Sequence, residues 1–492
     1  MTLDKNGKRY FGLLSFLKKA VQHSRASPSA TKVPRTYVLG NTSADLDSII
    51  SAIIYSYFAS SARSERGLQY IPVINLPEVP AGRELRRLRP EFVTALNLAT
   101  QRPLKTAKNE ASKGLKTLPD DEDTDNILSE SILTVAGLRD ELLDWKLSDD
   151  KKAVSLNIIM VDWNALPKIP PHAYGIPGVS DNVDGIVTSV VGCIDHHDDE
   201  GFISKHLVPG PGTQVSHIQT GVGSCTSLVV CELRKLGWWR DVVDDDKRIS
   251  EGQSLGDSDA EFESQAAQLA LAAILADTAN MTNESKVSDV DREAVKFLEN
   301  KISQCKSINW DRDSFYDLIM DAKSSSVDYL TAHETLRRDY KEWTDTIEPG
   351  HNIKIGICSV VKPLSWILKK CGSEYSEEDY DEEAFFDVLR SFSSTRDLDV
   401  VAVMTAFSSS SENEFRRELV VTLLNDKYIS NLKEFENAGA EYLSLEKKPF
   451  NEKNKDLGGQ IGRNTRVWRQ LDVTKSRKQV APLLRQVFTK ET

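Results

Sequence analysis

Two adjacent histidines that follow an acid are the residues of this sequence most suited to chemistry. Asp195, His196 and His197 come directly after an apolar run that ends at Ile194. Imidazole and carboxylate groups are the ligands that manganese, zinc and iron sites share. On these residues alone, one histidine could equally be a surface side chain and the other a core residue. The motif therefore indicates a metal centre only if further ligands converge on it.

Four more acids come at the ends of apolar segments elsewhere in the chain. They are Asp45, Asp47, Asp162 and Asp277. The first two are two positions apart, so on an extended segment their side chains project to the same face. Such carboxylates could hold two ions about 3.5–4 Å apart, which activate a water and clamp a phosphoryl group. Oxygen ligands with one or two imidazoles favour Mn²⁺ or Mg²⁺, and Co²⁺ after them, over a thiolate zinc site.

Short apolar runs alternate with helical patterns in the first part of the chain. Residues 36–39 and 156–161 are apolar runs of strand length, and residues 185–194 lead to the double histidine. Apolar side chains in residues 49–57 recur at helical spacing after Ser48, which we expect to be the helix N-cap. The alternation predicts an α/β fold with a doubly wound parallel sheet. Ligands of such sheets bind beyond the carboxyl ends of the strands, where the acids and histidines would meet.

A second α/β pattern begins after a charged stretch. Residues from about 290 to 345 look helical, whereas residues 353–361, 398–405 and 419–424 read as strands. We therefore expect two domains, residues 1–345 with the metal site and residues 346–492.

The composition excludes some classes of function. The chain of 492 residues has a formal net charge of −12, which argues against general binding to nucleic acid or acidic membranes. No apolar run reaches the roughly 18–20 residues of a membrane span. The six cysteines are scattered without a CxxC pair, as in reduced cytosolic proteins. Residues 1–35 are basic, so a mitochondrial presequence is an alternative, but we expect a helix packed on the domain and a cytoplasmic protein.

Four ordered motifs resemble the DHH phosphoesterase superfamily. They are Asn41-x-x-x-Asp45-x-Asp47-Ser48, Val161-Asp162-Trp163-Asn164, Asp195-His196-His197 and Asp277-Thr278. Residues 40–48, 356–366 and 468–482 look like the fungal cytosolic exopolyphosphatase branch, which is related to prune proteins and family II inorganic pyrophosphatases. The resemblance implies a DHH domain followed by a smaller α/β domain of the DHHA2 type.

The resemblance also implies the roles of individual residues in a centre of two ions. The implied metal ligands are Asp45, Asp47, Asp162, His196 and Asp277. His197 matches the residue beside the bridging phosphate oxygen and is expected to act as a general acid. Asn41 stands where the pyrophosphatases have a histidine ligand, and we assign it to the catalytic set with Asp162 and His197. Because an amide is a weaker ligand than imidazole, this departure suggests labile Mg²⁺ in place of firmly held Mn²⁺.

The C-terminal end of this acidic chain is basic, which suits a polyanion. A solvated basic helix face is the alternative interpretation. The resemblance implies that Arg477 and Lys478, together with Ser476, bind substrate phosphate. Lys362 and Arg396, each next to a predicted strand, are further candidates.

The function that these expectations favour is metal-dependent removal of terminal phosphate from inorganic polyphosphate. Alternatives are an inorganic pyrophosphatase, a phosphohydrolase acting on nucleoside polyphosphates or cyclic nucleotides, and a nanoRNase-type exonuclease. A non-catalytic, prune-like interaction protein on the same fold is the alternative from another class, but both histidines and all four acids are retained. We expect inorganic polyphosphate as the partner, no nucleic acid, no membrane and a monomer.

Overall fold

Two compact units make up the chain in the computed structural model. The first unit ends at Lys323 and the second begins at Ser324. The structure describes residues 2–3, 9–10, 12–26, 35–62, 69–104, 118–148, 154–169, 173–208, 215–240, 257–305, 308–348, 351–375, 382–408, 414–448 and 464–490.

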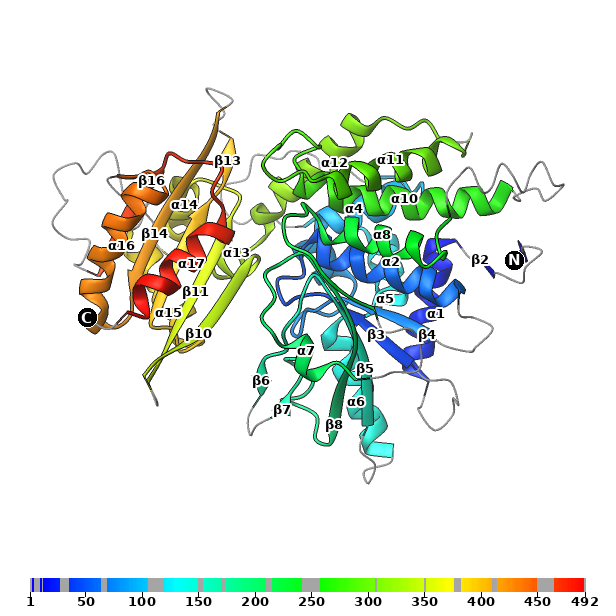
Figure 1. The fold of residues 1–492 in the computed structure, drawn as a ribbon, viewed down its shortest axis with the longest axis horizontal. Helices are drawn as coiled ribbons and strands as arrows, with labels where there is room; N and C mark the ends of the chain where they lie inside the picture. The colour runs from blue at the N-terminus through cyan, green and yellow to red at the C-terminus, as the bar shows by residue number, and fades with distance from the viewer. Residues whose placement is uncertain are drawn as a thin grey trace. The chain divides into compact units, whose positions relative to one another are not determined.

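A parallel sheet of five strands organises the first unit (Figure 1). In spatial order its strands are β4 (Gln69–Val73), β3 (Arg35–Leu39), β5 (Val154–Val161), β8 (Ile186–Asp195) and β9 (Ser216–Ile218). All four pairings are parallel, which confirms the predicted parallel sheet. From β3, the chain moves to β4 on one side and then to β5 on the other, so the strand order reverses at β3. The crevice between β3 and β5 is where sheets of this kind bind ligands.

The helices of the first unit pack on this sheet or on one another. They are α1 (Leu13–Arg25), α2 (Leu46–Ala62), α3 (Arg83–Leu88), α4 (Pro90–Ala99), α5 (Glu122–Ser131), α6 (Val135–Ser148), α7 (Ile203–His206), α8 (Cys225–Lys235), α10 (Asp257–Asp277), α11 (Asp289–Ser303) and α12 (Arg312–Ser325). Helices α2, α8 and α10 pack against one another (Figure 1), and residues 46–59 of α2 are all buried. The first helix, α1, buries Leu13, Phe16 and Leu17 in the core, as expected of a packed helix. Short strand pairs, β1 (Thr2–Leu3) with β2 (Arg9–Tyr10) and β6 (Lys168–Ile169) with β7 (Ala173–Tyr174), lie outside the main sheet.

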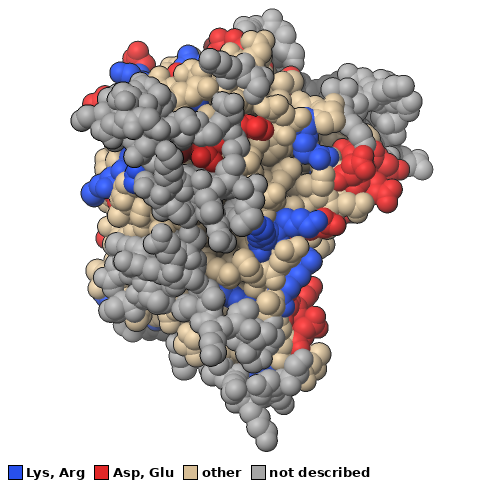
Figure 2. Space-filling view, turned by 90° about the vertical axis from the view of Figure 1, so that its right-hand side faces the viewer, with Lys and Arg blue, Asp and Glu red and all other residues tan. Residues whose placement is uncertain are grey.

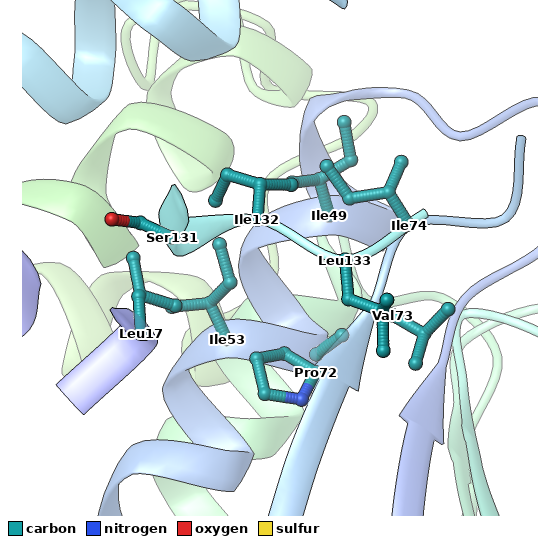
Figure 3. A pocket seen from close by; sticks show the side chains of 10 residues that line it. Leu17, Ile49, Ile53, Pro72, Val73, Ile74, Ser131, Ile132 and Leu133 are labelled. Atoms are coloured by element: carbon teal, nitrogen blue, oxygen red, sulfur yellow. The ribbon is translucent and has the colours of Figure 1, made fainter. Parts of the chain in front are cut away.

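A small pocket in this core is apolar. It lies between α1, α2, β4 and residues 131–133, and Figure 3 shows its lining of Leu, Ile, Val, Ala and Pro side chains with Ser131. Such a lining has almost no polar group to orient a ligand, whereas ligand sites combine apolar walls with placed polar groups. The pocket is therefore part of the core packing.

The second unit is built on a mixed sheet. Its strands are β10 (Tyr340–Glu348), β11 (His351–Val360), β12 (Val400–Thr405), β14 (Phe415–Leu423), β16 (Thr465–Gln470) and β15 (Leu445–Lys447) in spatial order, with β13 (Phe407–Ser408) paired to β14. Strands β11 and β12 are parallel, and the other neighbours are antiparallel. The remaining elements are η2 (Ser326–Tyr329), α13 (Ala332–Arg337), α14 (Leu364–Tyr375), α15 (Glu382–Ser394), η3 (Asp426–Tyr428), α16 (Ile429–Tyr442) and α17 (Arg477–Phe488). Alternate residues of the strands form two cores, one with α16 and α17 and the other with α13, α14 and α15.

The start of the second unit differs from the expected one. The stretch expected to be helical up to residue 345 becomes strand β10 from Tyr340, and residue 345 lies inside that strand. Along β10, partly buried and exposed side chains alternate, with Trp343, Asp345 and Ile347 partly buried. This period of two is that of a strand with one face covered. The two compact units divide after Lys323, and a domain boundary at residue 345 stays a prediction.

Two features of the described residues concern possible partners: the apolarity of the helices and the distribution of charged side chains. Among the described residues, no helix combines the length and apolarity that crossing a bilayer requires. On the face shown in Figure 2, the basic and acidic side chains of the described residues lie in small separate groups.

Candidate metal centre

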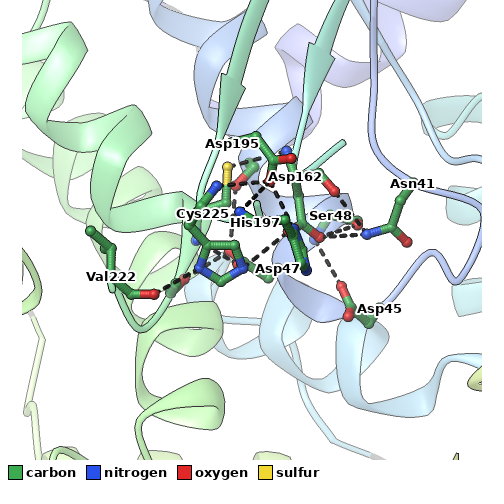
Figure 4. Close-up of polar contacts among 12 residues, drawn as sticks. Asn41, Asp45, Asp47, Ser48, Asp162, Asp195, His197, Val222 and Cys225 are labelled. Atoms are coloured by element: carbon green, nitrogen blue, oxygen red, sulfur yellow. Dashed lines mark hydrogen bonds and ion pairs between the residues drawn. The ribbon is translucent and has the colours of Figure 1, made fainter. Parts of the chain in front are cut away.

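The predicted ligands of the first unit lie at the point where the strand order reverses. Registers pair Leu39 of β3 with Met160 of β5, and Val161 of β5 with Ile194 of β8, so the carboxyl ends of these strands meet at one edge. The side chains that follow them point toward one another (Figure 4). They are Asn41, Asp45 and Asp47 after β3, Asp162 after β5, and Asp195, His196 and His197 at the end of β8.

Asp162 lies at the middle of this cluster and is only 2% exposed. Its Oδ2 accepts hydrogen bonds from Asn41 Nδ2 at 2.8 Å and from the Ser48 hydroxyl at 2.6 Å. Its Oδ1 is buried and accepts no hydrogen bond from the described residues. That oxygen lies 3.3 Å from His196 Nε2 and 3.4 Å from His197 Nδ1. An orphaned carboxylate oxygen facing two imidazoles is the arrangement that a cation would satisfy.

The His196 ring is oriented by a backbone carbonyl. Its Nδ1 lies 2.9 Å from the carbonyl oxygen of Val222, which can only accept a hydrogen bond. The proton of the neutral ring is therefore assigned to Nδ1, which leaves the lone pair of Nε2 toward Asp162. Metal-binding histidines commonly donate their other N–H to such an acceptor.

The His197 ring is paired with Asp195. Its Nδ1 lies 2.8 Å from Asp195 Oδ1, and Asn164 Nδ2 donates to Asp195 Oδ2 at 2.6 Å. Burial opposes ionisation of Asp195, but the hydrogen bond and charge of His197 outweigh it and lower the pKa of that carboxyl. Asp195 thus stays ionised and orients His197, whose ring remains partly exposed.

Asp45, rather than the expected Ser48, is the N-cap of helix α2. Its Oδ1 accepts the backbone N–H of Ser48 at 3.0 Å, and the helix starts at Leu46. The expectation that Ser48 is the N-cap is wrong, because its hydroxyl donates to Asp162 instead. Asp47, one residue into the helix, is nearly fully buried and contacts the start of α8.

The last predicted ligand, Asp277, ends helix α10. Burial, followed by the negative charges of Asp47 and Asp45, raises the pKa of Asp277 well above its usual value. The positive charge of Lys323 acts in the opposite direction but does not offset these effects, so the three carboxylates repel one another. A bound divalent ion would relieve this repulsion, so the residues present fit a metal centre.

Asn41 supports Asp162 in the structure. Its Nδ2 donates both to the Asp162 carboxylate and to the Asp162 carbonyl, the latter at 2.9 Å. Its Oδ1 accepts the backbone N–H of Ser43 at 2.9 Å and the Ser43 hydroxyl. Both ends of the amide are occupied, so the structure places Asn41 as a support of Asp162.

Several supporting residues were not predicted from the sequence. Ser48 and Asn164 adjoin the motif acids, so their polarity was a usable signal. Arg89 donates to the carbonyls of Ser43 and Ala44 and holds the loop in which Ala44 has φ 45°. No local signal connects Arg89 with a loop so far from it in sequence.

The predicted phosphate ligands lie in the second unit. Ser476 is the N-cap of α17 and forms a capping box with Gln479. Arg477 forms an ion pair with Asp339 at 2.8 Å and donates to its carbonyl at 3.0 Å, whereas Lys478 is exposed. The structure thus brings these three residues together at a helix N-terminus, which favours anions.

The two other basic candidates lie elsewhere in that unit. Lys362 follows β11, with its Nζ 3.8 Å from Asp328 Oδ1. Arg396 donates to the Phe392 carbonyl at 3.0 Å, and its guanidinium lies over the Phe392 ring. Burial lowers the pKa of Arg396. Arg396 follows α15 and Arg477 begins α17, and the positive charges of both act on the buried Cys358 thiol.

Known proteins resemble this chain along most of its length. Residues 318–487 match the family described as the DHHA2 domain. A protein of Schizosaccharomyces pombe named "Putative exopolyphosphatase" is 29% identical over 452 residues, which cover 91% of this chain and 90% of that protein. The solved structure of a Methanococcus jannaschii "putative family II inorganic pyrophosphatase" is 17% identical and has a TM-score of 0.47. It covers 92% of this chain and 100% of that one.

The C-terminal match shows that the chain carries a DHHA2 domain. Together with the fission-yeast relative, it supports a DHH-superfamily protein of the exopolyphosphatase-like kind. The resemblance seen in the sequence is thereby confirmed.

Proposed function

We propose that this protein is a metal-dependent exopolyphosphatase, which hydrolyses terminal phosphate from inorganic polyphosphate. The observation that carries the proposal is the orphaned Asp162 Oδ1 facing His196 and His197. The name of the fission-yeast relative supports the choice of substrate. The residues proposed to hold two ions, Mg²⁺ or Mn²⁺ with Co²⁺ as a substitute, are Asp45, Asp47, Asp162, His196 and Asp277.

The residues around the proposed metal centre have separate roles in hydrolysis. When bound, divalent ions supply a water of lowered pKa and neutralise charge on the phosphoryl group. Asn41 and Ser48 hold Asp162, and the Val222 carbonyl holds His196. Water would lose a proton and add to the terminal phosphorus while the bridging P–O bond breaks, which releases orthophosphate and the shortened polyphosphate. His197, oriented by Asp195, donates a proton to the departing oxygen.

The second unit supplies cations for the polyanion. Phosphate groups of the polyphosphate are bound by Arg477, by Lys478 and by the N-terminus of α17, which Ser476 caps. Lys362 and Arg396 are further candidates for the same task.

The cell compartment and assembly are part of the proposal. All six cysteines are free thiols, five of them buried, which suits the reducing cytoplasm. We place the enzyme there as a monomer.

Phosphate release from long-chain polyphosphate tests the function. The purified chain is assayed with EDTA, Mg²⁺ or Mn²⁺, and the same assay is run on pyrophosphate, a nucleoside tetraphosphate and a cyclic nucleotide. We expect metal-dependent release from polyphosphate at the highest kcat/KM. No release with either metal would refute the proposal, and a higher kcat/KM on pyrophosphate would reassign the substrate.

A further inference from the structure

Helix α8 begins against the carboxylate of Asp47, which is 3% exposed (Figure 4). Asp47 Oδ1 accepts the Ser224 hydroxyl at 2.8 Å, the Thr226 N–H at 2.8 Å and the Thr226 hydroxyl at 2.6 Å. Asp47 Oδ2 accepts the Cys225 N–H at 2.6 Å. A carboxylate oxygen offers about two lone-pair sites. Oδ1, which accepts these three hydrogen bonds and a longer one from Ser51 Oγ at 3.4 Å, has no free site, while Oδ2 keeps one.

The less engaged oxygen is the one turned toward the other candidate ligands. Asp47 Oδ2 lies 4.0 Å from His196 Nε2, which itself lies 3.3 Å from Asp162 Oδ1. The hydrogen bonds of α8 thus fix the rotation of the Asp47 carboxylate, with one particular oxygen facing the centre.

The hydrogen bond between the buried Thr226 hydroxyl and Asp47 has a known direction, because an ionised carboxylate can only accept. Thr226 Oγ1 lies 2.9 Å from Ser51 Oγ, and both residues are 0% exposed. A hydroxyl has a single proton, and that of Thr226 goes to Asp47 at 2.6 Å. Ser51 Oγ lies 3.4 Å from Asp47 Oδ1, so Thr226 is the nearer acceptor for its proton. A chain from Ser51 through Thr226 to Asp47 results, in which each bond polarises the next.

We propose that Thr226 is a positioning residue for the metal centre, holding Asp47 so that only Oδ2 meets an ion. The inference rests on the proposed function, since it assumes that Asp47 is a ligand. Residues that hydrogen-bond to metal ligands without contacting the metal typically change the metal affinity 10–100-fold when they are mutated. The alternative is that these hydrogen bonds merely cap α8, which would affect stability alone.

Thr226→Val in the full chain tests this inference. Valine keeps the branched Cβ and the buried volume but removes the hydroxyl. We expect the Mn²⁺ dissociation constant from isothermal titration to rise roughly 10–100-fold. Thr226→Ser, which keeps the hydroxyl, should restore most of the affinity, and Ser51→Ala should weaken binding less than Thr226→Val.

Ser227→Ala is the matched control on the same helix. The Ser227 hydroxyl is also buried, yet it has no hydrogen-bond partner among the described residues, so the variant should bind Mn²⁺ as the wild type does. A wild-type dissociation constant for Thr226→Val, with only its metal-free stability lowered, would overturn the inference. If Thr226→Val does not fold, unchanged Mn²⁺ affinity of Ser51→Ala overturns it instead. Wild-type protein that binds neither Mn²⁺ nor Mg²⁺ would refute the proposed function itself.

Discussion

Replacing Asp162 with Asn should separate metal binding from folding. Asparagine is chosen over alanine because the backbone at Asp162 has φ 54°, a region that Asn tolerates well. The amide oxygen can take the place of Oδ2 and keep the hydrogen bonds from Asn41 and Ser48. The amide NH₂ group then replaces the orphaned Oδ1. The side chain keeps its place and loses one ligand atom.

The expected magnitudes differ between the metal-free and the metal-bound protein. Without metal, the substitution removes one negative charge from a cluster of buried carboxylates and keeps two hydrogen bonds. The free energy of unfolding should therefore change by less than about 1 kcal/mol. In the wild type, Mn²⁺ at a hundredfold excess over its Kd should add about 2.7 kcal/mol, or roughly 5 °C in Tm. The variant should show no such increase.

Thermal unfolding with EDTA and with Mn²⁺ measures both quantities, and phosphate release measures the activity. A wild-type increase of Tm with Mn²⁺ in the Asp162→Asn variant would refute the reasoning. So would undiminished phosphate release. A metal-free variant destabilised by several kcal/mol would show that Asp162 serves the fold rather than an ion.

Three further predictions concern pH, substrate binding and metal removal. Burial raises the pKa of Glu141 to about 7, so the stability that its protonated form contributes is present below about pH 4.5 and lost as pH rises through 7. Relative to Glu141→Gln, the wild-type free energy of unfolding should fall by up to about 3 kcal/mol between pH 4.5 and 8, and a constant difference in denaturant titrations would contradict this. Arg477→Gln should raise KM for polyphosphate about tenfold or more. Arg485, on the same helix, forms an ion pair with Asp345 of β10, and Arg485→Gln should leave KM unchanged. EDTA should stop phosphate release, and excess Mg²⁺ or Mn²⁺ should restore it; activity that survives chelation would exclude the metal mechanism.

The convergence of acids and histidines was predictable because it follows from the sheet. Once residues 36–39 and 156–161 are strands, parallel pairing must bring the residues after them to one edge. The apolar runs and their acidic ends are local signals, and the structure confirms them as β3 and β5.

The inner organisation of the site was not predictable in the same way. The double role of Asn41 toward Asp162 depends on the turn that Arg89 holds from the junction of α3 and α4. The start of α8 contacts Asp47 across a separation of 177 positions or more. Contacts of this kind are decided by tertiary packing, which residue types alone do not report.

The error at β10 had a different cause. Charged residues around Trp343 resemble an exposed helix, although the side chains of this stretch also alternate in the manner of a strand. The strand forms because β11 offers it a partner along nearly its whole length. Pairing with a neighbour outweighed the local preference.

Strand β10 also determines how the C-terminal part could be produced alone. A fragment starting at residue 346 would lack most of β10 and leave the backbone of β11 without its neighbour. Because β11 carries Ile353, Ile355 and Ile357, its bare edge would invite pairing between separate molecules. A soluble fragment for crystallography or ligand screening should therefore begin no later than Ser324.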